Sequence, residues 1–331
     1  MSQLINQTPQ NDINVFVNTF KKKSKLAYRW RKDGIRKLAK DISPAYRDFV
    51  NTLLSNSKLK ISRYSGGKCH AIELGETHKL TRRATNEIYI DFNNCRVFAH
   101  ELGHSVDMLF GCNNVLSCSV LLEGDKTLFD IFSEELNSNH EQIHEFIMSE
   151  YAQSIDTNIY KGAFDIFMNN MPKYLELGKI EAPKKRHQLQ QELYKCGFVE
   201  VYYQMHTKKC FQVLEQKYIP ILDALSSIYD VTGLILTGHE INYFKMNKKL
   251  PTEEFFANVF ADKIMANHTR YDSLIKLMPR SFAAFEKLFA LIYERIQNGK
   301  KFTDLELKPV KRPNNGSIEL DEEEYEETEE E

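Results

Sequence analysis

Apolar residues recur at helical spacing along most of the chain. In residues 11–58 they stand three or four positions apart, with basic residues between them, and Ser43-Pro44 suits the start of a further helix. Residues 120–230, 252–268 and 280–298 show the same pattern, with interruptions expected near 169–172 and 183–186. The pattern predicts a mainly helical protein.

Residues 59–92 have a different pattern. The short segments KLKISRY, CHAIEL and EIYIDF resemble strands, and glycines at positions 66, 67 and 75 suit tight turns between them. We therefore expect a small antiparallel sheet here. A helix is predicted directly after it, from about Cys95 to Leu109. The expected fold class is α+β, mainly helical.

Charge is concentrated near the two ends of the chain, although the net charge is only −2. Residues 21–40 hold ten basic groups and one acid, whereas residues 317–331 hold ten acids and no base. The basic stretch, with Tyr28 and Trp30, suits a solvated helix face or a contact with nucleic acid or an acidic partner. The acidic tail suits a disordered interaction segment, which could also cover the basic helix or a cleft.

Composition excludes several classes of protein. With 42% hydrophobic residues the chain can bury a large core, so wholesale disorder is excluded. The polar N-terminus does not resemble a signal peptide, and no run of about 18–20 apolar residues predicts a membrane span. The six cysteines are scattered without a C-x-x-C pair, which is typical of reduced thiols. These features predict a cytoplasmic protein without membrane contact.

The strongest chemical signal is His100-Glu101-Leu102-Gly103-His104. Histidines four residues apart lie on one face of a helix and can share a zinc ion, while the glutamate between them can act as general base. The segment has apolar flanks and follows the predicted strand EIYIDF, which suits a desolvated site.

A second segment, His140-Glu141-Gln142-Ile143-His144, has the same spacing. Several glutamates surround it and no strand precedes it, so its composition is that of a solvated amphipathic helix. We interpret this second match as accidental.

A zinc site that hydrolyses its substrate needs a third protein ligand and an open position. The segment PTEEFFANVFADKI offers Glu254 at the start of a very apolar helix, where a buried carboxylate needs a partner. Glu253 is the alternative, and we expect it to face solvent in the first turn. Both residues would also suit a helix N-terminus without any metal. Asp107 and Asn258 lie one turn beyond proposed ligands and could orient a ligand imidazole.

These residues carry a family resemblance. HELGHSVDM followed downstream by EFFANVF resembles the catalytic domain of anthrax lethal factor and its relatives, which include metallopeptidase-like domains of phage head-morphogenesis proteins. The segment from Ile221 to Ile264 is similar to the phage version, with its Gly-His-x-x-x-Tyr stretch before an EFFA-type helix. The resemblance covers roughly residues 85–112 and 220–290.

The resemblance implies a zincin-like zinc metalloendopeptidase. His100, His104 and Glu254 would bind zinc, and Glu101 would be the general base. Tyr243 would donate to the developing oxyanion. Apart from the resemblance, His239 lies near Tyr243 in TGHEINY, where it could face the cleft and share this role or serve a structural one. Tyr243 lies eleven residues before Glu254, a longer spacing than in lethal factor, so it could instead be a packing residue.

The resemblance also suggests a division of the chain, because 150 residues separate His104 from Glu254, far more than in the toxin domain. We expect an N-terminal helical segment at 1–58, a sheet and active-site helix at 59–114, and an inserted helical lobe at 115–215. A C-terminal helical part at 216–300 and an acidic tail at 301–331 would follow.

Two functions fit the sequence. The first is a metallopeptidase that acts on a protein or peptide substrate. The alternative is a non-catalytic phage head-morphogenesis protein, associated with the virion and its structural proteins, that keeps the zincin domain as a scaffold.

Overall fold

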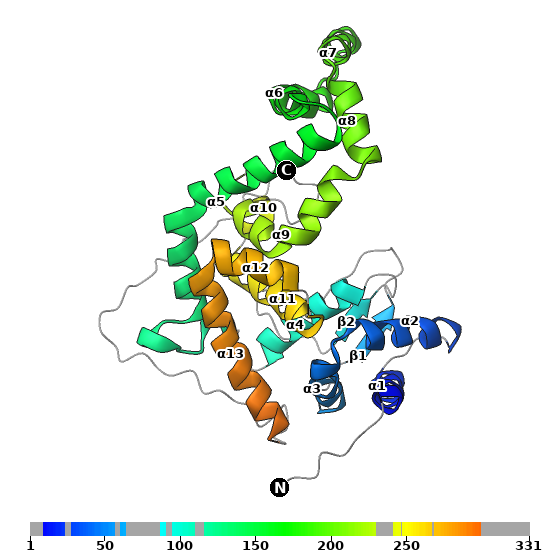
Figure 1. The fold of residues 1–331 in the computed structure, drawn as a ribbon, viewed down its shortest axis with the longest axis vertical. Helices are drawn as coiled ribbons and strands as arrows, with labels where there is room; N and C mark the ends of the chain where they lie inside the picture. The colour runs from blue at the N-terminus through cyan, green and yellow to red at the C-terminus, as the bar shows by residue number, and fades with distance from the viewer. Residues whose placement is uncertain are drawn as a thin grey trace, which may run out of the picture.

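A computed structural model describes residues 9–23, 28–56, 60–63, 87–90, 95–109, 116–229, 241–245, 247–266 and 268–298. Helices dominate these residues (Figure 1). None of the described helices combines the length and the apolar character that a membrane crossing requires.

Three helices form the N-terminal part: α1 (Pro9–Lys23), α2 (Tyr28–Asp41) and α3 (Pro44–Asn56). This confirms the helices predicted there. Phe16 and Phe20 of α1 are fully buried, and the Phe20 ring lies 5.4 Å from that of Phe98 on α4 (Cys95–Leu109). The apolar stripe of α1 therefore attaches this part to the helix that carries His100 and His104.

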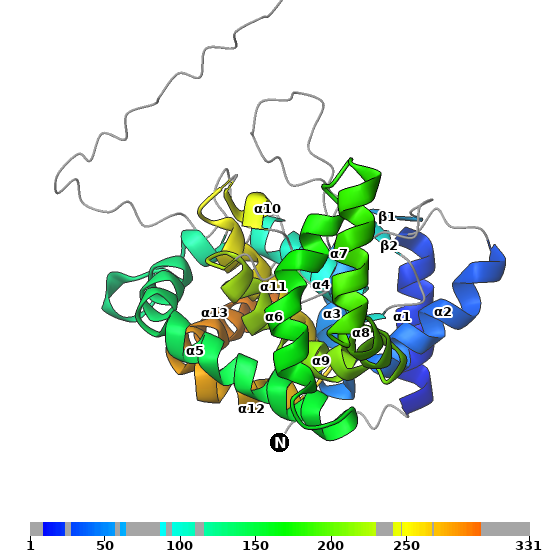
Figure 2. The ribbon, with the colours of Figure 1, turned by 90° about the horizontal axis from the view of Figure 1, so that it is seen from above.

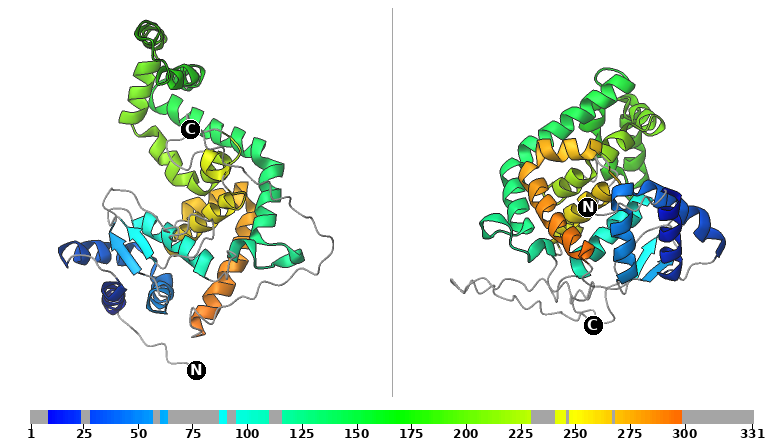
Figure 3. Two further views of the ribbon diagram at one scale, coloured as in Figure 1. Left: turned by 180° about the vertical axis from the view of Figure 1, so that it is seen from behind. Right: turned by 60° about the horizontal axis from the view of Figure 1, so that its bottom comes forward.

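The two described strands are β1 (Lys60–Arg63) and β2 (Glu87–Ile90), and they pair in parallel, with Ile61 opposite Ile88. The predicted antiparallel sheet is therefore wrong. The glycine-rich turns suggested hairpins, but the two described strands run in the same direction. Residues 64–86 lie between them, long enough for the crossover that a parallel pair requires. The predicted middle strand, CHAIEL, lies outside the described residues. Figure 3 shows the pair beside α4.

The centre of the molecule is the contact between α4 and α11 (Leu250–Ile264). Nearly every residue of α11 is buried, because α4, α5 (Leu128–Asn158), α9 (Cys210–Ser226) and α13 (Pro279–Gln297) all pack against it. Viewed from above, α4 and α11 lie between α5 on one side and α1–α3 on the other (Figure 2). A Cβ atom at Gly103 would lie 2.8 Å from the Cα of Ala257. Gly103 thus allows the two backbones to approach closely.

Long helices surround this pair: α5 (Leu128–Asn158), α9 (Cys210–Ser226) and α13 (Pro279–Gln297). Thr127 and Asp130 form a capping box at the start of α5. The carboxylate of Glu135 on α5 accepts hydrogen bonds from the backbone N–H groups of Arg280 and Ser281, at 2.9 and 2.7 Å. A residue of α5 therefore caps the N-terminus of α13.

The remaining helices complete the fold. α6 (Ala163–Leu177), α7 (Pro183–Lys195) and α8 (Phe198–Thr207) form a lobe that projects from the ends of α5 and α9 (Figure 1). The short helices are η1 (Leu116–Cys118), η2 (Glu123–Asp125), α10 (Ile241–Lys245) and α12 (His268–Leu277). Pro172 lies inside α6, so the interruption predicted near 169–172 is wrong. The interruption predicted at 183–186 is also misplaced, because the break lies at 178–182 and α7 begins at Pro183.

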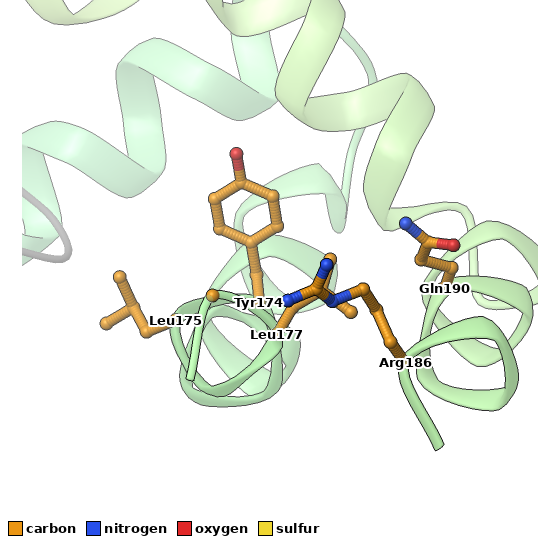
Figure 4. A pocket seen from close by; sticks show the side chains of 6 residues that line it. Tyr174, Leu175, Leu177, Arg186 and Gln190 are labelled. Carbon is orange, nitrogen blue, oxygen red and sulfur yellow. The ribbon is translucent and has the colours of Figure 1, made fainter. Parts of the chain in front are cut away.

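The lobe contains a hollow of about 510 Å³ between α6 and α7. Tyr174, Leu175 and Leu177 line it from α6, and Arg186 and Gln190 line it from α7 (Figure 4). The helices α6 and α7, which line the hollow, lie away from the central contact between α4 and α11 (Figure 1).

Candidate metal site

The two histidines of the first motif point to the same place from successive turns of α4. The Nε2 atoms of His100 and His104 are 3.1 Å apart, and the two rings are perpendicular. His104 is buried and His100 is partly buried. The helix thus brings two potential zinc ligands together, as their spacing of four residues predicted.

Glu254 reaches the same point from α11. Its Oε2 atom lies 3.2 Å from Nε2 of His100 and 3.3 Å from Nε2 of His104. A tetrahedral zinc site with ligands about 2.0–2.2 Å from the ion places neighbouring ligand atoms roughly 3.3–3.6 Å apart. The three donor atoms therefore stand close to the spacing that zinc requires. Within the described part of the chain, this is the one cluster of three or more such groups suited to a metal ion.

Charge couples the three groups. Burial would raise the pKa of Glu254, but the two imidazoles lower it well below its ordinary value. Burial would lower the pKa of His104, but the Glu254 carboxylate, aided by Glu101 and Glu253, raises it to about 9. Without metal, therefore, a proton on His104 balances the ionised Glu254. A zinc ion bound here would take the place of that proton.

Tyr243 lies beside Glu254. Its hydroxyl donates a hydrogen bond of 2.8 Å to Oε1 of Glu254, the oxygen that does not face the histidines. The structure thus brings Tyr243 to the site from α10. The role predicted for it, donation to an oxyanion, requires the hydroxyl to exchange this partner for substrate.

Glu101 lies on α4 next to His100, and its side chain is buried. Its charge contributes to the raised pKa of His104, so its carboxylate lies near the ligand set. A carboxylate that adjoins the ligands from the same helix suits a general base.

The structure confirms the expected contact between Asn258 and an imidazole of the cluster, that of His100. The Oδ1 atom of Asn258 lies 3.1 Å from Nδ1 of His100 and accepts a 2.8 Å hydrogen bond from Arg96. Its Nδ2 atom donates to Asp223 at 2.6 Å. Sequence reasoning missed Arg96 and Asp223. Arg96 did carry a signal, because it stands four residues before His100 on the same face of α4.

Asp107 does not orient an imidazole. Its two oxygens instead accept hydrogen bonds from the backbone N–H and the hydroxyl of Ser117, at 2.7 and 2.8 Å. It therefore fixes η1 against the end of α4.

The expectation that Glu253 faces solvent is also wrong, because this side chain is 2% exposed. The helix α11 is buried on almost all sides, so its first turn has no solvent-facing position for Glu253.

The second H-E-x-x-H segment lies within α5, away from any cluster of metal ligands in the described chain. His140 and His144 pack against the ring of Tyr229, with centroids 5.7 and 4.5 Å away. An aromatic contact on a half-exposed helix accounts for both histidines. His239, the other predicted contributor, lies outside the described residues.

Comparisons with known proteins identify no relative. No protein-family model matches the chain, and neither the curated proteins nor the solved structures yield a similar protein. The function must therefore be argued from the site itself.

Proposed function

We propose that this protein is a zinc-dependent metallopeptidase. The observation that carries the proposal is the convergence of His100, His104 and Glu254, whose donor atoms stand 3.1–3.3 Å apart in a buried setting. Two imidazoles and one carboxylate match the donor set of hydrolytic zinc sites, in which a fourth position stays open for water. Glu101 supplies the remaining group that hydrolysis needs.

Each residue has a distinct task under this proposal. His100, His104 and Glu254 would hold zinc, which when bound supplies a Lewis acid that activates water and polarises a carbonyl group. Glu101 accepts the proton of the attacking water and returns it to the leaving amine nitrogen. The hydroxyl of Tyr243 turns from Glu254 to donate to the oxyanion. The substrate is a protein or peptide.

Metal analysis and a peptidase assay test the proposal together. The wild type should bind one zinc ion per chain, and Glu254→Ala and His104→Ala should bind little or none. Glu101→Gln should keep the zinc but lose peptidase activity by about 10²- to 10⁴-fold, the usual contribution of a general base. A wild type that binds no zinc would sink the proposal.

The second H-E-x-x-H segment provides matched controls on the same chain. Glu141→Gln and the double variant His140→Ala/His144→Ala make the same chemical changes on α5. They should leave both zinc content and activity unchanged. Equal loss in the two sets of variants would show that the effects do not come from the proposed site.

A second function keeps the same site as a scaffold in a particle-assembly protein, as the phage resemblance suggested. The projecting lobe favours it, because Tyr194, Val199 and Tyr203 expose 75%, 45% and 69% of their surface there, as a partner-binding surface would. This function predicts a zinc-binding wild type whose co-expressed partner proteins stay intact. Cleavage of those partners by the wild type but not by Glu101→Gln supports the peptidase instead.

A further inference from the structure

A chain of polar residues lies behind His100 and joins the helices α4, α9, α11 and α12. Arg96 on α4 contacts Asn258 on α11, and Asn258 contacts Asp223 on α9. Arg96 also pairs with the buried Asp262 at 3.4 Å, and Arg270 pairs with the same aspartate. Two arginines and two aspartates thus balance each other in charge.

The chemistry of these groups fixes the direction of every hydrogen bond. A guanidinium group can only donate, so the atom of Asn258 that faces Arg96 must be the amide oxygen. That oxygen can only accept, so Nδ1 of His100, 3.1 Å away, must carry the hydrogen. In the neutral ring, Nε2 then keeps its lone pair and faces His104 and Glu254.

Asp223 prevents the amide from turning over. In the present orientation, the NH₂ group of Asn258 donates to the Asp223 carboxylate at 2.6 Å. Rotation by 180° would place the NH₂ group against Arg96 and His100 and the oxygen against a carboxylate. The turned amide would therefore lose its bonds to Arg96 and Asp223.

We propose that Arg96 and Asp223 act through Asn258 as positioning residues that hold His100 in the Nδ1–H tautomer and aim its Nε2 atom at zinc. The inference rests on the proposed zinc site for its final step. A buried set of charges adds little to stability compared with apolar packing, which is consistent with a role in positioning. Partners of this kind behind a ligand typically change metal affinity by about 10- to 100-fold.

His104 provides a comparison within the same site. Its Nδ1 atom is buried, and no hydrogen-bond partner for it occurs among the described residues. The polar chain therefore orients one of the two histidine ligands. In zinc-free protein, His100 should populate the Nδ1–H tautomer alone.

The experiment has two measurements. The first determines the tautomer of His100 in zinc-free wild type, and the second compares the zinc affinities of variants in which Asn258 and Asp223 exchange their side chains. Long-range ¹H–¹⁵N correlation spectra, recorded near pH 10 where an imidazole is neutral, distinguish the two tautomers. Asn258→Asp alone sets two carboxylates side by side and should lower zinc affinity about 10- to 100-fold. In the double variant Asn258→Asp/Asp223→Asn, the carboxylate at position 258 accepts from Arg96 and His100. The amide at position 223 then donates to that carboxylate. This double variant should recover most of the affinity.

Asn158→Asp is the matched control, because the Asn158 side chain is exposed and donates to the backbone carbonyl of Ser154 in its own helix. It should change neither measurement. An Nε2–H tautomer for His100 in the wild type would overturn the inference, and so would a double variant that stays folded but binds zinc as weakly as Asn258→Asp. A fixed Nδ1–H tautomer in a wild type that fails to bind added zinc would support the polar chain and sink the proposed function.

Discussion

Asp107 shows how burial gives one carboxyl group an unusual pKa. Burial raises the pKa of Asp107 to about 7, and the neighbouring Glu253 carboxylate adds to the rise, although the two Ser117 donors oppose it. In the unfolded chain, the same group has its ordinary pKa of 3.8. Between pH 3.8 and about pH 7, the folded protein therefore holds up to one more proton on Asp107 than the unfolded chain does.

A loss of stability with rising pH follows from Asp107. Because the unfolded chain ionises first, this group lowers the free energy of unfolding as pH rises from 3.8 to about 7, by no more than about 1.4 kcal/mol per pH unit. Asp107→Asn keeps partners for Ser117 but cannot ionise. Urea unfolding of zinc-free protein between about pH 5 and pH 7 should show the variant gaining stability relative to the wild type.

Asp272→Asn, a change at an exposed position on α12, serves as control and should show no such trend. If the difference between Asp107→Asn and the wild type stays constant over this range, Asp107 does not titrate as its burial implies.

At the scale of single residues, Glu253 and Glu254 show a limit of what the sequence can predict. The two residues are adjacent and identical, and both are 2% exposed. A step of about 100° around a helix separates their directions. Only the way α11 packs on α4 decides that Glu254 faces the histidines, while the charge of Glu253 acts on Asp107.

At the scale of elements, the site depends on how closely α4 and α11 approach. A Cβ atom at Gly103 would lie 2.8 Å from Cα and 3.0 Å from the carbonyl oxygen of Ala257. Both are backbone atoms, so no change of rotamer can make room. The two helices must separate to admit even one methyl group.

Gly103→Ala should therefore weaken both the fold and the site. Overpacking costs about 1–3 kcal/mol of unfolding free energy, more than the roughly 1 kcal/mol that alanine gains over glycine in a helix. Because the ligands come from both helices, zinc affinity should fall as well. Gly178→Ala is the control, since its nearest neighbour would be 3.8 Å away. Unchanged zinc binding and stability in Gly103→Ala would contradict the close contact.

The pairing direction of the two strands could not be predicted from their local sequence. The predicted strand segments at 58–64 and 87–92 contain β1 and β2, but their relative direction was predicted wrongly. Local composition identifies a strand, because it reflects the preference of each residue for extended backbone. Which strands become neighbours depends on the path of the chain between them. The glycines between the segments did not reveal that path.

Across the whole molecule, zinc would join segments that are 150 residues apart in sequence. A ligand that binds only the folded state stabilises it by about 2.7 kcal/mol when its concentration is 100 times its dissociation constant. Zinc should therefore raise the unfolding temperature, and a chelator should reverse the change. His104→Ala should show neither effect.

Hydrogen exchange should locate this stabilisation. Zinc should increase the protection of α4 and α11 more than that of the projecting lobe, α6–α8, which contributes no ligand. The lobe serves as an internal control in the same spectra. Equal protection of all three regions would mean that the lobe and the site unfold as one unit.

The sequence by itself determined what short-range spacing can encode. Residues four apart share a helix face, so the pairing of His100 with His104 and the general place of Glu101 could be predicted, as could most of the helices. Apolar surroundings also distinguished the motif at 100–104, whose histidines meet Glu254, from the one at 140–144, because a buried cluster needs a desolvated helix.

Only the tertiary structure decided what depends on contacts between distant segments. The packing of α11 brings Glu254 rather than Glu253 to the histidines. The strands β1 and β2 pair in parallel rather than as hairpins. Asn258 connects Arg96 to Asp223 by hydrogen bonds. Each of these follows from how separate elements pack. Packing is a property of the folded chain, and no local pattern of residues records it.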